Sequence, residues 1–137
     1  MTRAKETMRT EVKAHLDVWD FNCDHQSVSS AFGLEPSRVW NPGDKIGRTT
    51  RRQSSIGWRF DSELASSKPA AEHVRFIVDK ILPRKSYLRS IGQFEAWIVC
   101  VLHVYEGDRP DLVFEAELIT ALGELSIGLD IDLYNFR

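Results

Sequence analysis

The feature that most constrains this fold is the longest apolar run of the chain, FEAWIVCVLHVY from Phe94 to Tyr105. Twelve residues span roughly 40 Å as a strand but only about 18 Å as a helix, and β-branched and aromatic residues are typical of strands. Gly92 precedes the run and a Glu-Gly-Asp turn at 106–108 ends it. Both alternating faces are mostly apolar, as in a strand with neighbours on each side. The run therefore predicts the central strand of a sheet.

Alternation of apolar and polar residues predicts three further strands, each with one face toward a core. They lie at residues 11–19, 55–61 and 127–134, and a short extended piece is expected at 38–40. The last strand should turn Ile127, Leu129, Ile131 and Leu133 inward. Residues 1–10 show no periodicity and are expected to form a flexible leader, followed by a single domain over residues 11–137.

Helical spacing of apolar residues predicts helices between these strands. One should lie between an Asp24 cap and Gly33, and another should run from a Ser67 cap to Leu82, where Pro83 interrupts it. A turn or two of helix is expected at 84–91, and a further helix at 115–122 should end at Gly123. We expect an α+β two-layer sandwich, in which a mainly antiparallel sheet of four or five strands has helices packed on one face. A loose repeat of strand, helix and strand suggests a ferredoxin-like arrangement.

Composition excludes several functional classes. The chain is 42% apolar and 28% charged, which is typical of a soluble globular protein, and its net charge of −2 argues against nucleic-acid binding. The N-terminus lacks the apolar core of a signal peptide, and no run reaches the roughly 20 apolar residues that cross a membrane. Of the two cysteines, Cys100 lies on the apolar face of the predicted central strand, so a buried thiol is expected. These features predict a cytoplasmic protein.

Four motifs in order resemble those of a known family: GLEPSRVWNPGD at 33–44, SIGWRFDSEL at 55–64, LITALGELSIG at 118–128 and DIDLYNF at 130–136. Their order and spacing are similar to those of the small bacterial proteins grouped as domain of unknown function 4279. The resemblance covers roughly residues 11–136. It implies an α+β domain, and it implies no catalytic residue.

The outward face of the sheet is the first candidate site. If the strands are neighbours, His15, Asp17, Trp19, Arg59, His103, Tyr105, Asp130, Asp132 and Tyr134 share this face. Histidines and carboxylates can bind metals, but no recognised metal motif is present and no metal site is predicted. A solvated or partner-covered surface is the simplest interpretation of the face, and aromatic residues among charges favour a partner.

Charge is distributed unevenly along the chain. Between Arg38 and Arg59 there are six basic residues and one acid, and Arg48, Arg51 and Arg52 lie in the exposed loop at 41–53. Between Glu106 and Asp132 there are eight acids and one Arg. The basic loop is suited to an acidic protein surface or a phosphate, although loops with several arginines are most often simply solvated. Trp40 and Trp58, on either side of this loop, are expected to pack rather than to stack on a base or sugar.

The sequence leads to one preferred hypothesis and two alternatives. The preferred hypothesis is a non-enzymatic protein-interaction module of inhibitor or toxin-immunity type, with no cofactor and no catalytic residue. The binding residues predicted for it are Trp19, Arg59, His103, Tyr105, Asp130, Asp132, Tyr134, Arg48, Arg51 and Arg52. One alternative is a small-ligand or metal-binding domain, or an enzyme, that uses His15, His103, Asp130 and Asp132. The other is a homodimer that buries the sheet face against its own copy.

Overall fold

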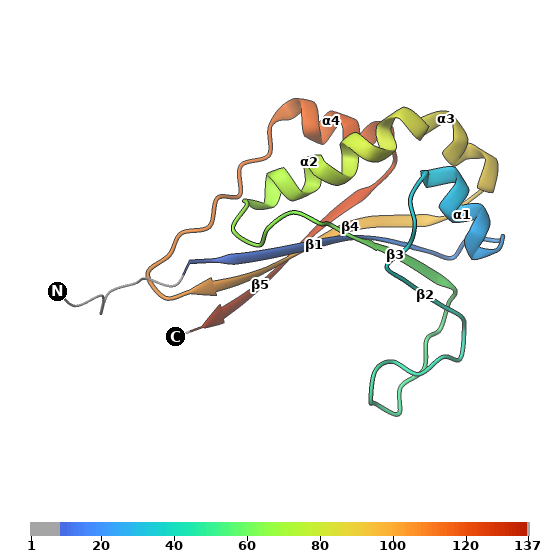
Figure 1. The fold of residues 1–137 in the computed structure, drawn as a ribbon, viewed down its shortest axis with the longest axis horizontal. Helices are drawn as coiled ribbons and strands as arrows, with labels where there is room; N and C mark the ends of the chain where they lie inside the picture. Colours follow the sequence, from blue (N-terminus) through green and yellow to red (C-terminus); the bar gives the residue numbers. More distant parts are fainter. Residues whose placement is uncertain (1–8, 137) are drawn as a thin grey trace.

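The structure, a computed structural model, describes residues 9–136, and within them the strands form one twisted sheet (Figure 1). The strand order is β2-β3-β1-β4-β5. The strands are β1 (Glu11–Trp19), β2 (Arg38–Trp40), β3 (Gly57–Asp61), β4 (Glu95–Tyr105) and β5 (Gly128–Phe136). All neighbours are antiparallel except β4 and β5, which are parallel. The mainly antiparallel sheet is therefore confirmed.

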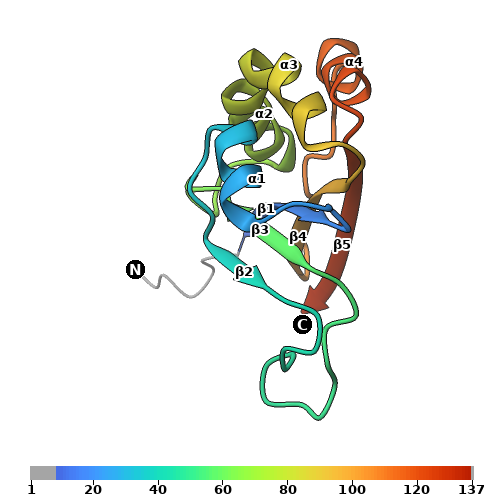
Figure 2. The same ribbon diagram turned by 90° about the vertical axis from the view of Figure 1, so that its right-hand side faces the viewer.

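The described helices pack on one side of this sheet only (Figures 1 and 2). They are α1 (His25–Phe32), α2 (Ala70–Ile81), α3 (Lys85–Leu88) and α4 (Ala116–Glu124). Short 3-10 turns, Leu82–Arg84 and Arg89–Ile91, lie before and after α3. The α+β fold with helices on one face is confirmed.

The apolar run is strand β4, as predicted, and it has a neighbour on each side. The prediction that it is the central strand is wrong, because that position belongs to β1. β1 pairs over its whole length with β4 and pairs on its other edge with β3. Apolar character alone did not distinguish the two strands, because both have a buried inner face and a neighbour on each edge.

The connection from β4 through α4 to β5 joins two strands that are direct neighbours. A ferredoxin-like sheet instead places another strand between the two parallel strands of each such unit. Among the described residues of the first half of the chain no two strands are paired in parallel: β1 with β3 and β2 with β3 are both antiparallel. The loose repeat in the sequence therefore does not reflect a ferredoxin-like topology.

Three helix ends lie where the sequence predicts them, and two do not. The Asp24 carboxylate caps α1 by accepting a 2.8 Å hydrogen bond from the Ser27 N–H, and α1 ends at Gly33, whose φ is 69°. The helix α2 ends before Pro83. The helix starts at Ala70, with Pro69 at the N-cap position instead of the predicted Ser67, because the backbone first makes a separate turn from Ala65 to Lys68.

The predicted stop of α4 at Gly123 is also wrong. The helix continues to Glu124 and the chain then reverses at Ser126, which has a φ of 56°. Leu125 and Ile127, on either side of that residue, are buried. Packing of these two apolar side chains holds a non-glycine residue in a conformation that sequence rules reserve for glycine.

The core lies between the helices and the inner face of the sheet. Leu16, Trp58 and Ile98 are fully buried there, and Trp58 donates a 3.0 Å hydrogen bond from Nε1 to Ser29 Oγ. Cys100 is buried as predicted, and burial raises the pKa of its thiol to about 12. Leu133 was predicted to point inward but is 52% exposed, because the end of β5 extends beyond the helix layer (Figure 1).

Residues 41–53, predicted as an exposed loop, form an ordered hairpin that we call the arm. Lys45 and Arg52 make a β-bridge, and the Ile46 N–H donates a 3.0 Å hydrogen bond to the carbonyl of Arg51. The arm leaves the sheet between β2 and β3 and projects away from the helices (Figures 1 and 2).

The predicted flexible leader lies mostly outside the described residues, which begin at residue 9. Its last residue, Thr10, is held by the Asp108 carboxylate, which accepts hydrogen bonds from the Thr10 N–H at 2.6 Å and from its hydroxyl at 2.5 Å.

Candidate functional site

The side of the sheet away from the helices, which we call the open face, brings together most of the predicted site residues. Strand register determines this: Asp17 of β1 lies opposite Arg59 of β3 and Trp97 of β4, and Asp130 of β5 lies opposite Val99 of β4. Seven predicted binding residues share the open face: Trp19, Arg59, His103, Tyr105, Asp130, Asp132 and Tyr134.

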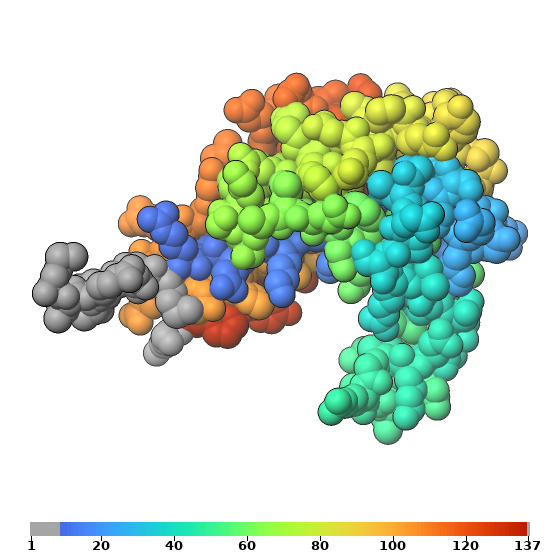
Figure 3. Space-filling view, viewed as in Figure 1, coloured from blue at the N-terminus to red at the C-terminus, as the bar shows by residue number. Residues whose placement is uncertain are grey.

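The three predicted arginines of the arm do not lie on the open face itself. Arg48, Arg51 and Arg52 are exposed on the hairpin, which continues past the end of β2 and the start of β3. In the space-filling view the arm stands away from the strands and leaves an open space beneath the sheet (Figure 3). The arm therefore borders the open face where β2 ends and β3 begins. Its basic side chains are exposed to a molecule that lies against that face.

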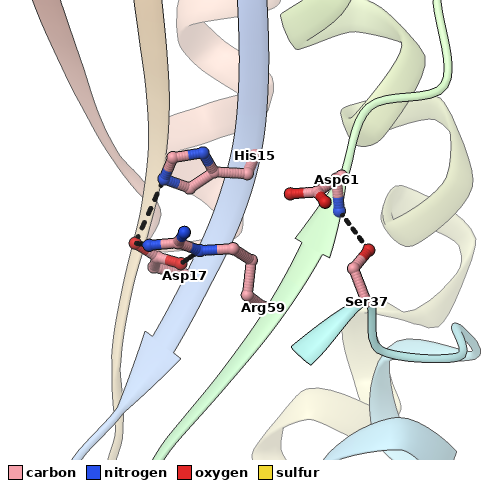
Figure 4. A network of polar contacts seen from close by, with 5 residues as sticks. All are labelled: His15, Asp17, Ser37, Arg59 and Asp61. Carbon is pink, nitrogen blue, oxygen red and sulfur yellow. Dashed lines mark hydrogen bonds and ion pairs between the residues drawn. The ribbon is translucent and has the colours of Figure 1, made fainter. Parts of the chain in front are cut away.

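A charged network occupies the middle of the open face (Figure 4). Arg59 donates two hydrogen bonds to the Asp17 carboxylate, at 2.6 Å from Nε and 3.1 Å from Nη2. His15 Nε2 lies 3.3 Å from the same carboxylate. In the next row the Asp61 N–H donates to Ser37 Oγ at 2.8 Å, which ties the start of β2 to β3. The bidentate pair of Arg59 and Asp17 fixes the position of both side chains.

Two carboxylates of the open face, Asp17 on the central strand β1 and Asp132 on the edge strand β5, have pKa values that are shifted in opposite directions. Burial alone would raise the pKa of Asp17, but hydrogen bonds from His15 and Arg59 outweigh it, so that the pKa of Asp17 lies below its usual value. On β5, burial and the neighbouring Asp130 carboxylate raise the pKa of Asp132 above its usual value. Asp17 thus has an ion-pair partner within the fold, whereas within residues 9–136 neither Asp130 nor Asp132 has a basic side chain within ion-pair distance.

Two indole rings lie across glycines of neighbouring strands on the open face. A Cβ atom added to Gly57 would lie 1.9 Å from the Trp40 ring, and one added to Gly128 would lie 2.5 Å from the Trp97 ring. Each ring therefore lies against the backbone of the next strand, with its other side turned away from the sheet. Arg38 and Arg59 lie over the Trp40 ring at 5.5 and 5.9 Å. The guanidinium groups hold that indole in place through cation–π attraction.

Sequence reasoning missed Trp40 and Trp97 as site residues, although it placed Trp97 on the correct side of its strand. Trp58 is in the core, and Trp40 packs as expected, but against Gly57 on the open face and not in the core. The signal in the sequence was a glycine within each of two predicted strands, Gly57 and Gly128, which in the structure are the first residues of β3 and β5. Glycine in a strand often marks a place where another group approaches the backbone closely.

The two histidines proposed for a metal or catalytic site do not meet. His15 lies opposite Val99, whereas His103 lies four residues further along β4, opposite Glu11, which puts the two about 13 Å apart along the strands. His103 instead packs edge-on against Tyr134 and Phe136, at ring-centre distances of 5.9 and 5.2 Å. Within residues 9–136 no group of three metal-binding side chains is close enough to hold an ion.

Two pockets, of about 620 and 630 Å³, lie away from the open face. A pocket of about 620 Å³ lies at one end of the sheet, between the end of β1, α3 and the turn after α4. Its rim carries Lys85, Arg89 and Glu124, and its wall includes Asp20 and Ser126, which both have positive φ. Lys85 is half-buried and the other polar side chains that line the pocket are exposed, so the pocket has no buried polar side chain with which to recognise a ligand.

Fold and site together define a protein of the α+β class, with a helix-covered face and an open, aromatic and charged face on one sheet. No helix in the described part of the chain is long and apolar enough to span a membrane. The family model described as Domain of unknown function (DUF4279) matches residues 10–136, and the chain belongs to this family. Comparisons with curated proteins and with solved structures gave no match.

Proposed function

We propose that this chain is a non-enzymatic protein-interaction module whose docking surface is the open face. The observation that carries the proposal is the arrangement of layers: the described helices cover one face of the sheet, while the other carries three of the four tryptophans, Trp19, Trp40 and Trp97. Removing that much aromatic surface from water lowers the free energy, so contact with a partner is favoured.

The chemistry of the open face favours a protein partner. Tryptophan, tyrosine and arginine are the residues that most often contribute large binding energies at protein interfaces. Here the indole rings of Trp40 and Trp97 are held flat by the strands beneath them, and Arg59 is fixed by its pair with Asp17. Binding to side chains that are already ordered costs little conformational entropy, which supports docking on a preformed surface.

The same geometry gives little support to an enzyme or metal site. The carboxylate closest to His15 is Asp17, which already accepts two hydrogen bonds from Arg59. A carboxylate committed in this way has a lowered pKa and is a weak base. The inhibitor or toxin-immunity role suggested by the sequence is a further step of this proposal, and it depends on the identity of the partner.

Site-specific photocrosslinking in the source cell tests the proposal and requires no candidate partner. p-Benzoylphenylalanine replaces Tyr134, which is 53% exposed on the open face, and in a matched strain it replaces Tyr87, which is 54% exposed on the helix side. We expect discrete protein adducts from the first position after illumination and none of the same mass from the second. The adduct mass identifies the occupant.

A follow-up in purified form separates docking from chance proximity. Binding of the identified protein should weaken at least tenfold when Trp97→Ala removes the central indole, and should not change with Tyr87→Ala. Failure to obtain adducts at position 134, or identical adducts at both positions, would contradict the proposal.

A further inference from the structure

A serine and a histidine form a hydrogen-bonded pair where the chain passes from β3 to α2. We propose that Ser62 is an activated nucleophile: His73 takes its proton, and its oxygen accepts one acyl group from a thioester or an activated ester. The inference goes beyond the proposed function, because it assigns a reaction of one equivalent, without turnover, to a cavity that borders the open face.

The two ring nitrogens of His73 have different partners, which determine where its proton lies. Nε2 lies 3.1 Å from the backbone carbonyl of Ala65, which can only accept a hydrogen bond. In the neutral ring the proton is therefore on Nε2, and Nδ1 has a free electron pair. Nδ1 lies 2.7 Å from Ser62 Oγ, so the hydroxyl donates to the histidine. A hydroxyl that donates to a base, which is itself oriented by a third group, is the arrangement of activated serines.

The surroundings of His73 keep its ring in the neutral state that a base requires. The residue is 1% exposed, and burial lowers the pKa of His73 below its usual 6.5, although the Ala65 carbonyl and the Glu72 carboxylate act in the opposite direction. The ring is therefore free to take a proton from Ser62 at neutral pH. The Leu64 N–H donates a 3.3 Å hydrogen bond to Ser62 Oγ, which stabilises the negative charge that develops on this oxygen as its proton leaves.

The backbone beside β1 leaves room next to this pair. The Ser62 N–H donates to the Ala14 carbonyl and the Val12 N–H donates to the Ser66 carbonyl, both at 2.8 Å. Between these two hydrogen bonds, residues 63–65 lie opposite a single residue of β1, so the chain bulges away from the strand. A cavity of about 490 Å³ lies between β1 and this bulge, and Ser62 and His73 both line it.

The walls of the cavity suit a short, uncharged acyl chain. Val12, Leu64 and Val101 line it with apolar surface. Lys13, an exposed residue of β1, lines it too, and its ammonium group is available to the oxyanion that forms on the acyl carbonyl. Asp61 lies on the same wall, which favours an uncharged chain over an anionic one. His15 also lines the cavity, so that it opens beside the charged network of the open face.

The acyl transfer has two bond changes. Ser62 Oγ attacks the carbonyl carbon as His73 Nδ1 takes the hydroxyl proton, and a bond forms between the oxygen and the carbon. The bond from that carbon to the leaving group then breaks, and the leaving group departs with the electron pair as a thiolate or a phenolate. Such an anion is stable without a proton, so His73 returns its proton to solvent and the ring is neutral again.

Burial of His73 stops the reaction at the acyl-serine. Hydrolysis of the ester would require a water molecule that gives its proton to the same histidine. Nε2 is held by the Ala65 carbonyl, and Nδ1 faces the Ser62 oxygen that now carries the acyl group. A histidine that is 1% exposed has no side left for water. The acylated serine therefore persists.

Acetylation by p-nitrophenyl acetate at neutral pH tests the inference on the full wild-type chain. We expect a burst of one equivalent of p-nitrophenolate with no steady release after it, and peptide mass spectrometry should find the acetyl group on Ser62. The same peptide map distinguishes acetylated lysines.

Ser66 is an internal control in this experiment. It is half-buried, as Ser62 is, and lines the same cavity, but within residues 9–136 it makes no hydrogen bond to a histidine. Ser62 should be acetylated at least about a hundredfold faster than Ser66, which is the usual contribution of a general base.

Three variants assign the rate to the pair. Ser62→Ala should abolish the burst, and Ser66→Ala should leave it unchanged. His73→Gln should slow the acetylation of Ser62 at least about a hundredfold in a protein whose fold is checked by circular dichroism. If that variant does not fold, the ratio of the Ser62 and Ser66 rates in the wild-type protein decides the question.

The possible failures are distinct from those of the proposed function. Equal rates at Ser62 and Ser66, or a Ser62 rate that does not change in folded His73→Gln, overturn the inference and leave the pair a structural role. Docking on the open face is then unaffected, because crosslinking at position 134 measures it separately. Release of p-nitrophenolate far beyond one equivalent would contradict both the single reaction and the non-enzymatic part of the proposed function.

Discussion

The two faces of this sheet use the same residue type for different purposes. On the helix side Trp58 is fully buried, stacks on Phe32 at a ring distance of 5.5 Å and donates a hydrogen bond to Ser29. On the open face Trp97 rests on the backbone of Gly128 and turns its other side outward. Burial of tryptophan on the first face stabilises the fold. On the second face the same side chain provides surface whose burial is left to a partner.

The largest expected difference between the two faces is in stability. Trp58→Ala should lower the free energy of unfolding by about 3–5 kcal/mol, because it leaves a cavity and removes the partner of a buried hydroxyl. Trp97→Ala should cost no more than about 1 kcal/mol, which is the worth of a cross-strand contact. Urea denaturation followed by circular dichroism measures both. Equal losses would mean that the open face is part of the core, and the comparison would fail.

The division into two faces was predictable from the sequence because a strand places alternate residues on opposite sides. Leu16 and His15, or Ile98 and Trp97, are assigned correctly by alternation alone. Where the helix layer ends was not predictable: Leu133 follows the inward alternation but is 52% exposed, because β5 extends past the helices (Figure 1).

The site was less predictable than the fold, because it depends on strand order. The pair of Asp17 and Arg59 joins residues 42 positions apart, and it forms only because β3 lies beside β1. The position of Trp40 depends on its pairing with Gly57 across a 3-residue edge strand. No local pattern encodes either contact. The chain reversal at Ser126 was missed for a similar reason, since it depends on the burial of Leu125 and Ile127 in the core.

A glycine substitution sharpens the comparison on the open face. Gly57→Ala would place a methyl group where the Trp40 ring now lies, so the indole must move, at a cost of about 1–3 kcal/mol. Gly123, which has no neighbour within 4 Å of its Cβ position, is the control, and Gly123→Ala should be neutral or slightly stabilising because it lies within α4. Thermal unfolding compares the two variants.

A double-mutant cycle then assigns the cause. In a Trp40→Ala background Gly57→Ala should cost much less than it does alone, because the ring that it displaces is absent. If the cost is the same in both backgrounds, the effect comes from the strand backbone and the indole does not rest on Gly57.

The ion pair of Asp17 and Arg59, on the open face, makes the free energy of unfolding depend on pH in the acidic range. The folded-state pKa of Asp17 lies below the ordinary value of 3.8, so its stabilising effect is complete above that value and is lost as the pH falls through the folded-state pKa. Arg59→Gln should lower the free energy of unfolding by about 1–2 kcal/mol at pH 7 and flatten its decline below pH 3.8. Chemical denaturation between pH 7 and pH 3 tests this. An unchanged acid profile would show that Asp17 is held by other groups.

The smallest expected effect lies on the helix side and in a different range of pH. His73 of α2 is buried, accepts or donates a 2.7 Å hydrogen bond at Nδ1 with Ser62 and lies 3.1 Å from the carbonyl of Ala65 at Nε2. Burial lowers the pKa of His73 below its usual 6.5, so below that pH the unfolded chain takes up a proton that the folded chain resists. The free energy of unfolding should therefore decline as the pH falls below 6.5, well before Asp17 responds. His73→Gln should abolish this decline while His103→Gln, on the open face, should leave it intact. Should His103→Gln remove the decline instead, the acid response near neutral pH would belong to the open face, and the assignment of the two ranges of pH to the two faces would be reversed.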